Sequence, residues 1–483
     1  MELFSDETGK QFTRGSLKSA FDDGDIKDRL RMRKEWLEHN RKSIGRLFEF
    51  IEKTVHDIDG NIVLGFMTGE RYIEGYDFDI WAEKLSGPGD QEVIWRPGGA
   101  FYTDRRFDEL PGKAHEIGRQ VSLLKPDVGR IYSEIENFFY QKLKKSARTV
   151  LLEIASYISA GCTGAALNII SENDDLLKEH SGLIEQIADH RPFFDKLSAS
   201  FQRSGTFGIW AGWCKDSFAG VNLNRRRWVD GTFSPVHTEE MHEIGLPQGY
   251  SQSLACVSAL SGNEPYSFDH ETIIRILSGG AYLDAAALNA LNDMGYAEYT
   301  GFSVSRHLHA DCIERFAPHR LNGCFAGITR NCRQSFYKIP AAVLIKSHAS
   351  SECLASIVDY DGNEKAPCCL GVYENSLGGR ICAAGYYPWT YMHNLSKSTQ
   401  IKNIMRWLSG DTLPAYISSL HKIVLWIRKT SRDQWAFALL NCSYDAAENI
   451  ELFIKTKKKR IRTFRMDMSS AEADAAGYAG GRA

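Results

Sequence analysis

The chain has 483 residues, more than one ordinary domain holds, so we expect about two to four domains. Its 58 Lys and Arg residues nearly balance 61 Asp and Glu residues, and the net charge of -3 gives no electrostatic reason to expect a nucleic-acid or membrane-surface protein. No apolar run approaches the roughly 20 residues that span a bilayer. The polar, acidic start MELFSDETGK is unlike a signal peptide. Together these features predict a cytoplasmic protein with neither nucleic-acid nor membrane partners.

The 11 cysteines are scattered, apart from the adjacent Cys368 and Cys369, and none belongs to a CxxC pair. Most of them lie inside apolar runs, so we expect reduced thiols in the core rather than disulfides or a zinc site. The sequence contains neither a glycine-rich nucleotide loop nor a GxSxG nucleophile elbow. We therefore predict no metal and no organic cofactor.

Residues 16–58 are predicted to form a helix, because apolar side chains recur there every three to four positions. Four short apolar runs follow, and each is predicted to be a buried strand followed by helical sequence. These runs are residues 61–67, 92–99, 129–135 and 165–170.

The four strand–helix units have spacings of about 30–37 residues, which predicts parallel strands with helices outside them. That unit length fits a (β/α)₈ barrel, which needs eight such units. Residues 1–200 are therefore predicted to be the second half of a barrel, strands 5 to 8. An open doubly wound sheet is the alternative.

Beyond residue 200, shorter strands and helices alternate, which predicts a second α/β domain over residues 201–305. Over residues 306–465, β-branched and aromatic runs split by turns predict a mainly antiparallel β domain with one helix at 398–410. The small, weakly hydrophobic residues at the end predict a disordered tail over 466–483.

Active sites of parallel α/β folds lie at the carboxyl ends of the strands. The predicted strand ends of the barrel half are rich in carboxylate, arginine, asparagine and aromatic side chains. These residue types are typical of a carbohydrate site, because sugar hydroxyls need polar partners and sugar faces stack on aromatic rings. The candidate substrate-binding residues are Glu70, Tyr76, Trp95, Arg96, Tyr102 and Asn137.

The third predicted strand ends in two carboxylates, Glu134 and Glu136, which are two residues apart and so share a face of the strand. Two acids so close cannot both stay ionised without help from Arg or Asn donors. Retaining glycoside hydrolysis uses a carboxylate nucleophile about 5–5.5 Å from a second carboxyl group. We therefore predict Glu134 as a nucleophile and Glu136 as a supporting or alternative carboxylate. The other interpretation is an ion network with Arg96 or Arg130.

Several segments carry a resemblance to a known family. They are SEIENF at 133–138, SAGCTGA at 159–165, LSGGAYLD at 277–284, ENSLGGR at 374–380 and GYYPW at 385–389. The chain resembles the glycoside hydrolase family 42 β-galactosidases and their uncharacterised relatives, up to about residue 465. The resemblance implies a catalytic (β/α)₈ barrel, a flavodoxin-like, amidotransferase-like trimerisation domain and a C-terminal β-sandwich. It also implies retaining hydrolysis of a β-glycoside, with β-galactosides as the commonest substrate, and a possible homotrimer.

In that family the nucleophile is a glutamate at the end of the seventh barrel strand, a position that Glu134 matches. The family's acid/base lies on the fourth strand, which we expect upstream of Met1. The second domain lacks a Cys-His-Glu amidotransferase triad, so the resemblance implies a role in assembly. Three interpretations stay open: a glycosidase whose other barrel half carries the acid, an inactive carbohydrate-binding or oligomerisation protein derived from such an enzyme, or a half barrel that pairs with another.

Overall fold

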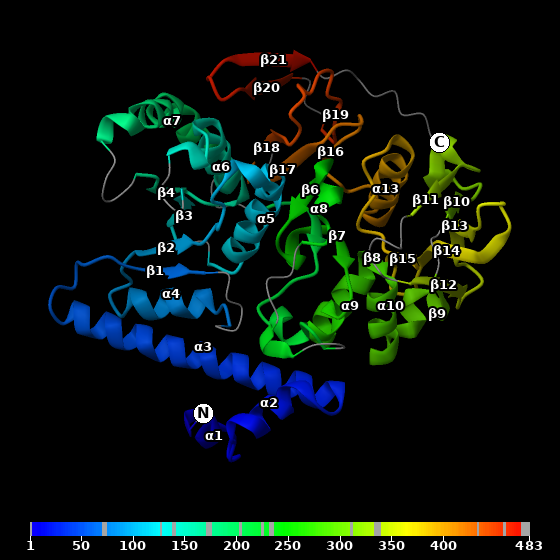
Figure 1. Cartoon of the computed structure of the whole chain (residues 1–483), viewed down its shortest axis with the longest axis horizontal. Helices are drawn as coiled ribbons and strands as arrows, with labels where there is room; N and C mark the ends of the chain where they lie inside the picture. Colours follow the sequence, from blue (N-terminus) through cyan, green and yellow to red (C-terminus); the bar gives the residue numbers. More distant parts are fainter. Residues whose placement is uncertain are drawn as a thin grey trace.

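The computed structural model describes residues 2–69, 75–125, 128–137, 142–170, 176–201, 205–223, 227–230, 236–309, 313–332, 340–431, 434–456 and 460–474. Two sheets dominate this part of the chain, one with four strands and one with 11, and helices lie between and around them (Figure 1). The protein is therefore a mixed α/β structure.

The N-terminal residues form three helices, α1 (Glu2–Thr8), α2 (Arg14–Asp22) and α3 (Ile26–His56). The single helix predicted over 16–58 is thus broken. Gly24 has a φ of +88°, and Asp25 caps α3 by accepting a hydrogen bond of 2.8 Å from the Lys27 N–H. A single turn at a glycine leaves the three-to-four spacing of the apolar residues unchanged on both sides. The sequence pattern therefore did not show the break. Among the described helices, none is both long and apolar enough to cross a membrane.

Four parallel strands follow in chain order, each hydrogen-bonded to the next along the sheet. The prediction of parallel strands separated by helices is confirmed here, whereas their place as strands 5 to 8 of a barrel stays a prediction. The strands are β1 (Leu64–Thr68), β2 (Val93–Pro97), β3 (Arg130–Glu136) and β4 (Gly164–Asn168). Their helices are α4 (Phe78–Ser86), α5 (Leu110–Val121), α6 (Ala147–Ala160) and α7 (Ser181–Phe201).

One face of the four-stranded sheet is packed against helices. Trp95, Ile131 and Ile135 are fully buried there, in one core with side chains of α5 and α6. Because successive side chains of a strand point to opposite faces, their neighbours Arg96 and Glu134 lie on the other face. We call this second face of β2 and β3 the carboxylate face; it carries Ile94, Arg96, Tyr132, Glu134 and Glu136.

The large sheet has parallel strands in its middle and antiparallel strands at its ends. In sheet order its strands are β11 (Thr329–Asn331), β10 (Ile313–Phe316), β13 (Glu352–Val358), β14 (Glu364–Glu374), β15 (Arg380–Ala384), β8 (Gly280–Asp284), β7 (Ala255–Leu260), β5 (Gly208–Ala211), β6 (Ile244–Gly249), β17 (Ile423–Ser431) and β18 (Gln434–Asn441). Its central strands β6-β5-β7-β8-β15 follow the doubly wound order 2-1-3-4-5.

The remaining elements are short helices and two-stranded ribbons around this sheet. The helices are α8 (Glu239–Glu243), α9 (His270–Ser278), α10 (Ala285–Leu291), α11 (Ala297–Thr300) and α13 (Leu395–Leu408). The ribbons pair β9 (Phe302–Leu308) with β12 (Ala341–Lys346), β16 (Ala415–Ile417) with β19 (Leu452–Ile454), and β20 (Arg460–Phe464) with β21 (Ser470–Asp474).

The large sheet crosses the boundary predicted between residues 305 and 306. Strands β15 and β17 belong to the predicted β-sandwich, yet they pair in parallel with β8 and β6. Strands β10, β11, β13 and β14 of that segment extend the same sheet at one end, and β18 extends it at the other. Short apolar runs look alike whether their partner is parallel or antiparallel, so the sequence pattern could not separate the two cases. The domain limits themselves stay a prediction.

Two further expectations differ from the structure. Residues 470–474, inside the predicted disordered tail, form β21, while 475–483 lie outside the described residues. Cys353 on β13 and Cys368 on β14 form a disulfide, with Cα atoms 5.6 Å apart, so the expectation of reduced thiols alone is wrong. Only the pairing of β13 with β14 brings these two cysteines side by side.

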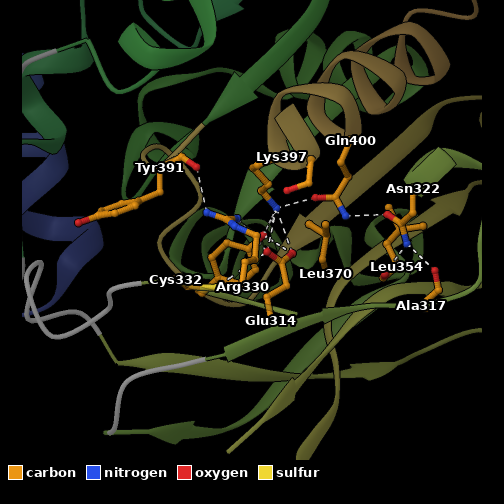
Figure 2. A network of polar contacts seen from close by, with 12 residues as sticks. Glu314, Ala317, Asn322, Arg330, Cys332, Leu354, Leu370, Tyr391, Lys397 and Gln400 are labelled. Carbon is orange, nitrogen blue, oxygen red and sulfur yellow. Dashed lines mark hydrogen bonds and ion pairs between the residues drawn. The ribbon is translucent and has the colours of Figure 1, made fainter. Parts of the chain in front are cut away.

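A buried ion network ties α13 to the large sheet (Figure 2). The Glu314 carboxylate of β10 lies 3.0 Å from Lys397 Nζ and 2.9 Å from Arg330 Nη1, and it accepts a hydrogen bond of 2.7 Å from the Tyr386 hydroxyl. Lys397 also donates to the Gln400 side chain at 2.6 Å. Burial by itself would raise the pKa of Glu314, but the charges of Lys397 and Arg330 outweigh it and hold the pKa below its usual value.

Replacing Lys397 by methionine should lower the free energy of unfolding by roughly 3–5 kcal/mol, because it leaves a buried carboxylate short of one counter-charge. Equilibrium unfolding in urea measures the change. The matched control is Lys365→Met, which removes an exposed ion pair with Asp359 and should cost a small fraction of that. Equal losses in the two variants would contradict a stabilising role for the network.

Candidate functional site

The carboxylate face brings an arginine of one strand to a glutamate of the next. Arg96 of β2 lies 3.1 Å from the Glu134 carboxylate of β3, with side chains 37% and 12% exposed. Both residues lie near the carboxyl ends of parallel strands, where active sites of such sheets are found. The pair therefore stands at the expected place, with the glutamate largely buried and the arginine reaching it from the side.

Burial raises the pKa of Glu134, and the neighbouring charge of Glu136 raises it further. Arg96 opposes both effects but does not cancel them. The sequence analysis left two interpretations for these carboxylates, a nucleophile with support and an ion network with Arg96. The structure shows the ion pair of Glu134 with Arg96, whereas the nucleophile stays a prediction.

The end of β3 is held by a buried lysine that the sequence analysis missed. Lys145 donates from Nζ to the carbonyl oxygens of Phe101 at 2.7 Å and Glu136 at 3.2 Å. It also forms a fully buried ion pair with Glu153 of α6. Burial raises the pKa of Glu153 to about 8, although Lys145 opposes the shift. One side chain thus anchors the chain after β2 and after β3 to the same helix. A lysine before a helix start is common on surfaces, so no sequence signal marked it.

The two residues that follow β2, Gly98 and Gly99, have no room for a side chain. A Cβ atom on Gly98 would lie 2.8 Å from the Thr68 carbonyl oxygen and 3.5 Å from Glu134 Oε2. A Cβ atom on Gly99 would lie 2.8 Å from the Tyr157 hydroxyl. Both positions therefore require glycine, and Gly98 packs against the Glu134 carboxylate.

Two predicted substrate-binding residues lie in the core rather than on the carboxylate face. Trp95 is fully buried among helix side chains, and its indole N–H donates to the Thr68 hydroxyl at 3.2 Å. Tyr76 is 2% exposed, and its hydroxyl donates to the Gly69 carbonyl at 2.7 Å. These are packing positions, because aromatic residues in helix-facing strands fill the core as readily as they line a cleft.

The other predicted residues have mixed placements. Asn137 follows β3 and is buried, with its N–H bonded to the Asn168 carbonyl at 3.2 Å and its Oδ1 without a hydrogen bond within the described residues. Tyr102 is partly exposed in the segment after β2. Glu70 lies outside the described residues. Arg96, Glu134 and Glu136 are thus the predicted residues that share one face. Within the described chain, no cluster of His, Cys, Asp or Glu side chains could hold a metal ion.

No family model matches this sequence, and no curated protein matches it. Solved structures do show similarity. A catalytic mutant of a GH42 β-galactosidase from G. stearothermophilus superposes with a TM-score of 0.51 at 11% identity, covering 79% of this chain and 58% of that one. The α-L-fucosidase isoenzyme 2 from Paenibacillus thiaminolyticus gives a TM-score of 0.49 at 10% identity, covering 88% and 73%.

The similarity to the β-galactosidase shows a shared fold, that of a glycoside hydrolase, and at 11% identity it shows nothing finer. The chain spans 58% of the length of that β-galactosidase. Any activity, substrate or assembly drawn from it is therefore a matter for proposal.

The charges around Glu134 predict opposite effects for two substitutions. Glu136→Gln removes a like charge and should lower the pKa of Glu134, whereas Arg96→Met removes the opposing cation and should raise it. Carbon-13 NMR of glutamate carboxyl groups, followed through a pH titration, measures both. Glu92→Gln is the control, because Glu92 pairs with Arg130 at the amino end of the same sheet and should leave the Glu134 titration unchanged. Shifts of the same sign in both test variants would contradict the arrangement.

Proposed function

We propose that the chain is a glycoside hydrolase-like protein in which Glu134 is the nucleophile of a retaining reaction on a β-glycoside, with β-galactosides as the leading substrates. The observation that carries the proposal is the Arg96–Glu134 pair at the carboxyl end of a parallel sheet, within a fold similar to that of a β-galactosidase. Retaining glycosidases need a carboxylate at this kind of position.

In this reaction the Glu134 carboxylate attacks the anomeric carbon, the bond to the leaving oxygen breaks, and a general acid gives that oxygen its proton. Water then cleaves the glycosyl ester and restores the carboxylate. Arg96 orients Glu134 and favours its ionised form. Because burial and Glu136 raise the pKa of Glu134, the nucleophile gains its charge only as the pH rises above that pKa, and labelling or turnover should rise with it.

The general acid of this reaction has two candidate sources. The first source is Glu136, which shares the carboxylate face with Glu134 and lies within the described residues. The family resemblance points instead to a fourth-strand glutamate, supplied by the other half of a barrel. Either source has to place its carboxyl group about 5–5.5 Å from Glu134 in a retaining enzyme.

A second candidate function is carbohydrate binding or oligomerisation without turnover. The raised pKa of Glu134 lowers its ionised fraction, and the ion pair with Arg96 engages the carboxylate that is ionised. Both features favour a binding role over a nucleophilic one. The same face would then hold sugar hydroxyls through its arginine and carboxylates, with no covalent step.

A 2-deoxy-2-fluoro-β-galactoside with a good leaving group distinguishes the two functions, because it forms a stable ester only with a working nucleophile. We expect mass spectrometry to find the label on the peptide that contains Glu134, and Glu134→Gln to abolish it. Glu92→Gln, the other carboxylate of this sheet with an arginine partner, should still be labelled.

Label on another carboxylate would reject Glu134 as the nucleophile. Absence of label, together with saturable binding of galactose that Arg96→Met weakens, would favour the binding protein over the hydrolase.

A further inference from the structure

A cavity of about 590 Å³ lies at the carboxyl ends of β5 and β7 in the large sheet. After β5 the chain continues to β6, toward one edge of the sheet. After β7 it continues to β8, toward the opposite edge. This is the topological switch point of a doubly wound sheet, where the connections diverge and leave a crevice that commonly binds ligands. The volume falls in the range of small-molecule sites.

The cavity is separate from the carboxylate face. Helix α5 packs on the four-stranded sheet through buried Leu110, Ala114 and Ile117, and it contributes Arg119 to the cavity wall. None of the described residues that line the cavity belongs to the carboxylate face. Helix α5 therefore stands between the two places, and a ligand in one cannot contact the other.

One wall is built around the buried carboxylate of Asp284. It accepts hydrogen bonds from the Ser261 hydroxyl at 2.6 Å, the Gly262 N–H at 3.1 Å and the Trp389 indole N–H at 3.1 Å. It also caps α10 by accepting a hydrogen bond of 2.8 Å from the Ala287 N–H. The loop after β7 and the Trp389 ring are thus fixed before any ligand arrives.

A second wall is a histidine–glutamate pair. His237 lies 3.2 Å from Glu264 through Nδ1 and 3.1 Å from the Ala259 carbonyl through Nε2. The Trp389 ring packs edge-on against it at 4.3 Å between centroids. Burial would lower the pKa of His237, but the charge of Glu264 outweighs it and raises the pKa. Acceptors hold both ring nitrogens of His237, so the ring is fixed in the cavity wall and neither nitrogen is left to act as a base.

The remaining lining combines carboxylates with aromatic rings. Glu239 and Glu240 begin α8 beside the cavity, and Trp213 and Tyr387 line it with Trp389. Within the described residues the Glu239 carboxylate makes no hydrogen bond or ion pair, and burial, helped by Glu243 and Asp108, raises its pKa to about 7. A largely buried carboxylate of this kind is a ready acceptor for ligand hydroxyls.

The charges decide the class of ligand. Several carboxylates line the cavity, while Arg119 already pairs with Glu116 and His237 with Glu264, so a phosphate or carboxylate ligand would meet repulsion. Carboxylate acceptors next to aromatic faces suit a ligand with many hydroxyl groups and apolar C–H faces. We propose that this cavity is a second carbohydrate site, which takes a neutral mono- or disaccharide independently of any reaction at Glu134.

The proposal does not depend on the proposed hydrolase, and the test keeps the two apart. Galactose, which cannot be hydrolysed, is titrated against the full chain by saturation-transfer NMR, with spermidine and inorganic phosphate as cationic and anionic probes. We expect saturable binding of galactose that Glu239→Gln weakens by about tenfold, as for loss of one strong hydrogen bond. Glu92→Gln, which alters a carboxylate outside both places, should change this affinity by less than about twofold.

Val221→Trp provides a second variant, because it fills the cavity from another wall without touching the ion pairs. It should abolish the Glu239-dependent binding. The proposal is overturned if galactose fails to bind, if Glu134→Gln but not Glu239→Gln weakens its binding, or if spermidine or phosphate binds in the cavity in preference to the sugar.

Discussion

The burial of one helix layer between two sheets is the constraint on which the structure depends. Helices α5 and α6 pack on β1–β4 from one side, and from the other they meet Tyr250 and Trp426 of the large sheet, all within one core. The approach is so close that a Cβ atom on Gly118 of α5 would lie 2.2 Å from the Tyr250 ring. Figure 1 shows this layer between the two sheets. Because apolar burial is the main favourable term in folding, a helix layer that serves two sheets makes their relative placement cooperative.

That layer also decides where charge can lie. Helices occupy one face of β1–β4, so Arg96, Glu134 and Glu136 are confined to the other face. The switch-point cavity lies beyond the layer, at the ends of different parallel strands. Each place is stiffened by a buried polar group that acts on the backbone, Lys145 behind the carboxylate face and Asp284 behind the cavity. Such groups hold the surrounding backbone and side chains in fixed positions, which is what a preorganised site would need.

The buried ion pairs stabilise the packing of separate segments for the same physical reason. Glu314 with Lys397 and Glu264 with His237 each join elements distant in the sequence. Lys145 pairs with Glu153 nearby in the chain, but it also binds the carbonyl oxygen of Phe101 after β2. A charge moved out of water is costly unless it is paired, so each pair is stable only when both elements are docked. Polar contacts of this kind favour one arrangement of the helices over similar alternatives. The apolar core alone discriminates less between these arrangements. The similarity to a β-galactosidase shows that this arrangement is a glycoside hydrolase-like fold, and a fold by itself assigns no reaction.

The sequence by itself determined the parallel β1–β4 units, because continuous apolar runs alternating with amphipathic helices are a local pattern. It also determined the shared face of Glu134 and Glu136, since the alternation of side chains along a strand is short-range geometry. Only the tertiary structure decided the rest. Which face the helices cover placed Trp95 in the core. Strand pairing joined β15 and β17 to the parallel sheet and Cys353 to Cys368. Contacts between residues far apart in the chain made the cavity and its His237–Glu264 pair, because sequence periodicity carries no information on which distant elements meet.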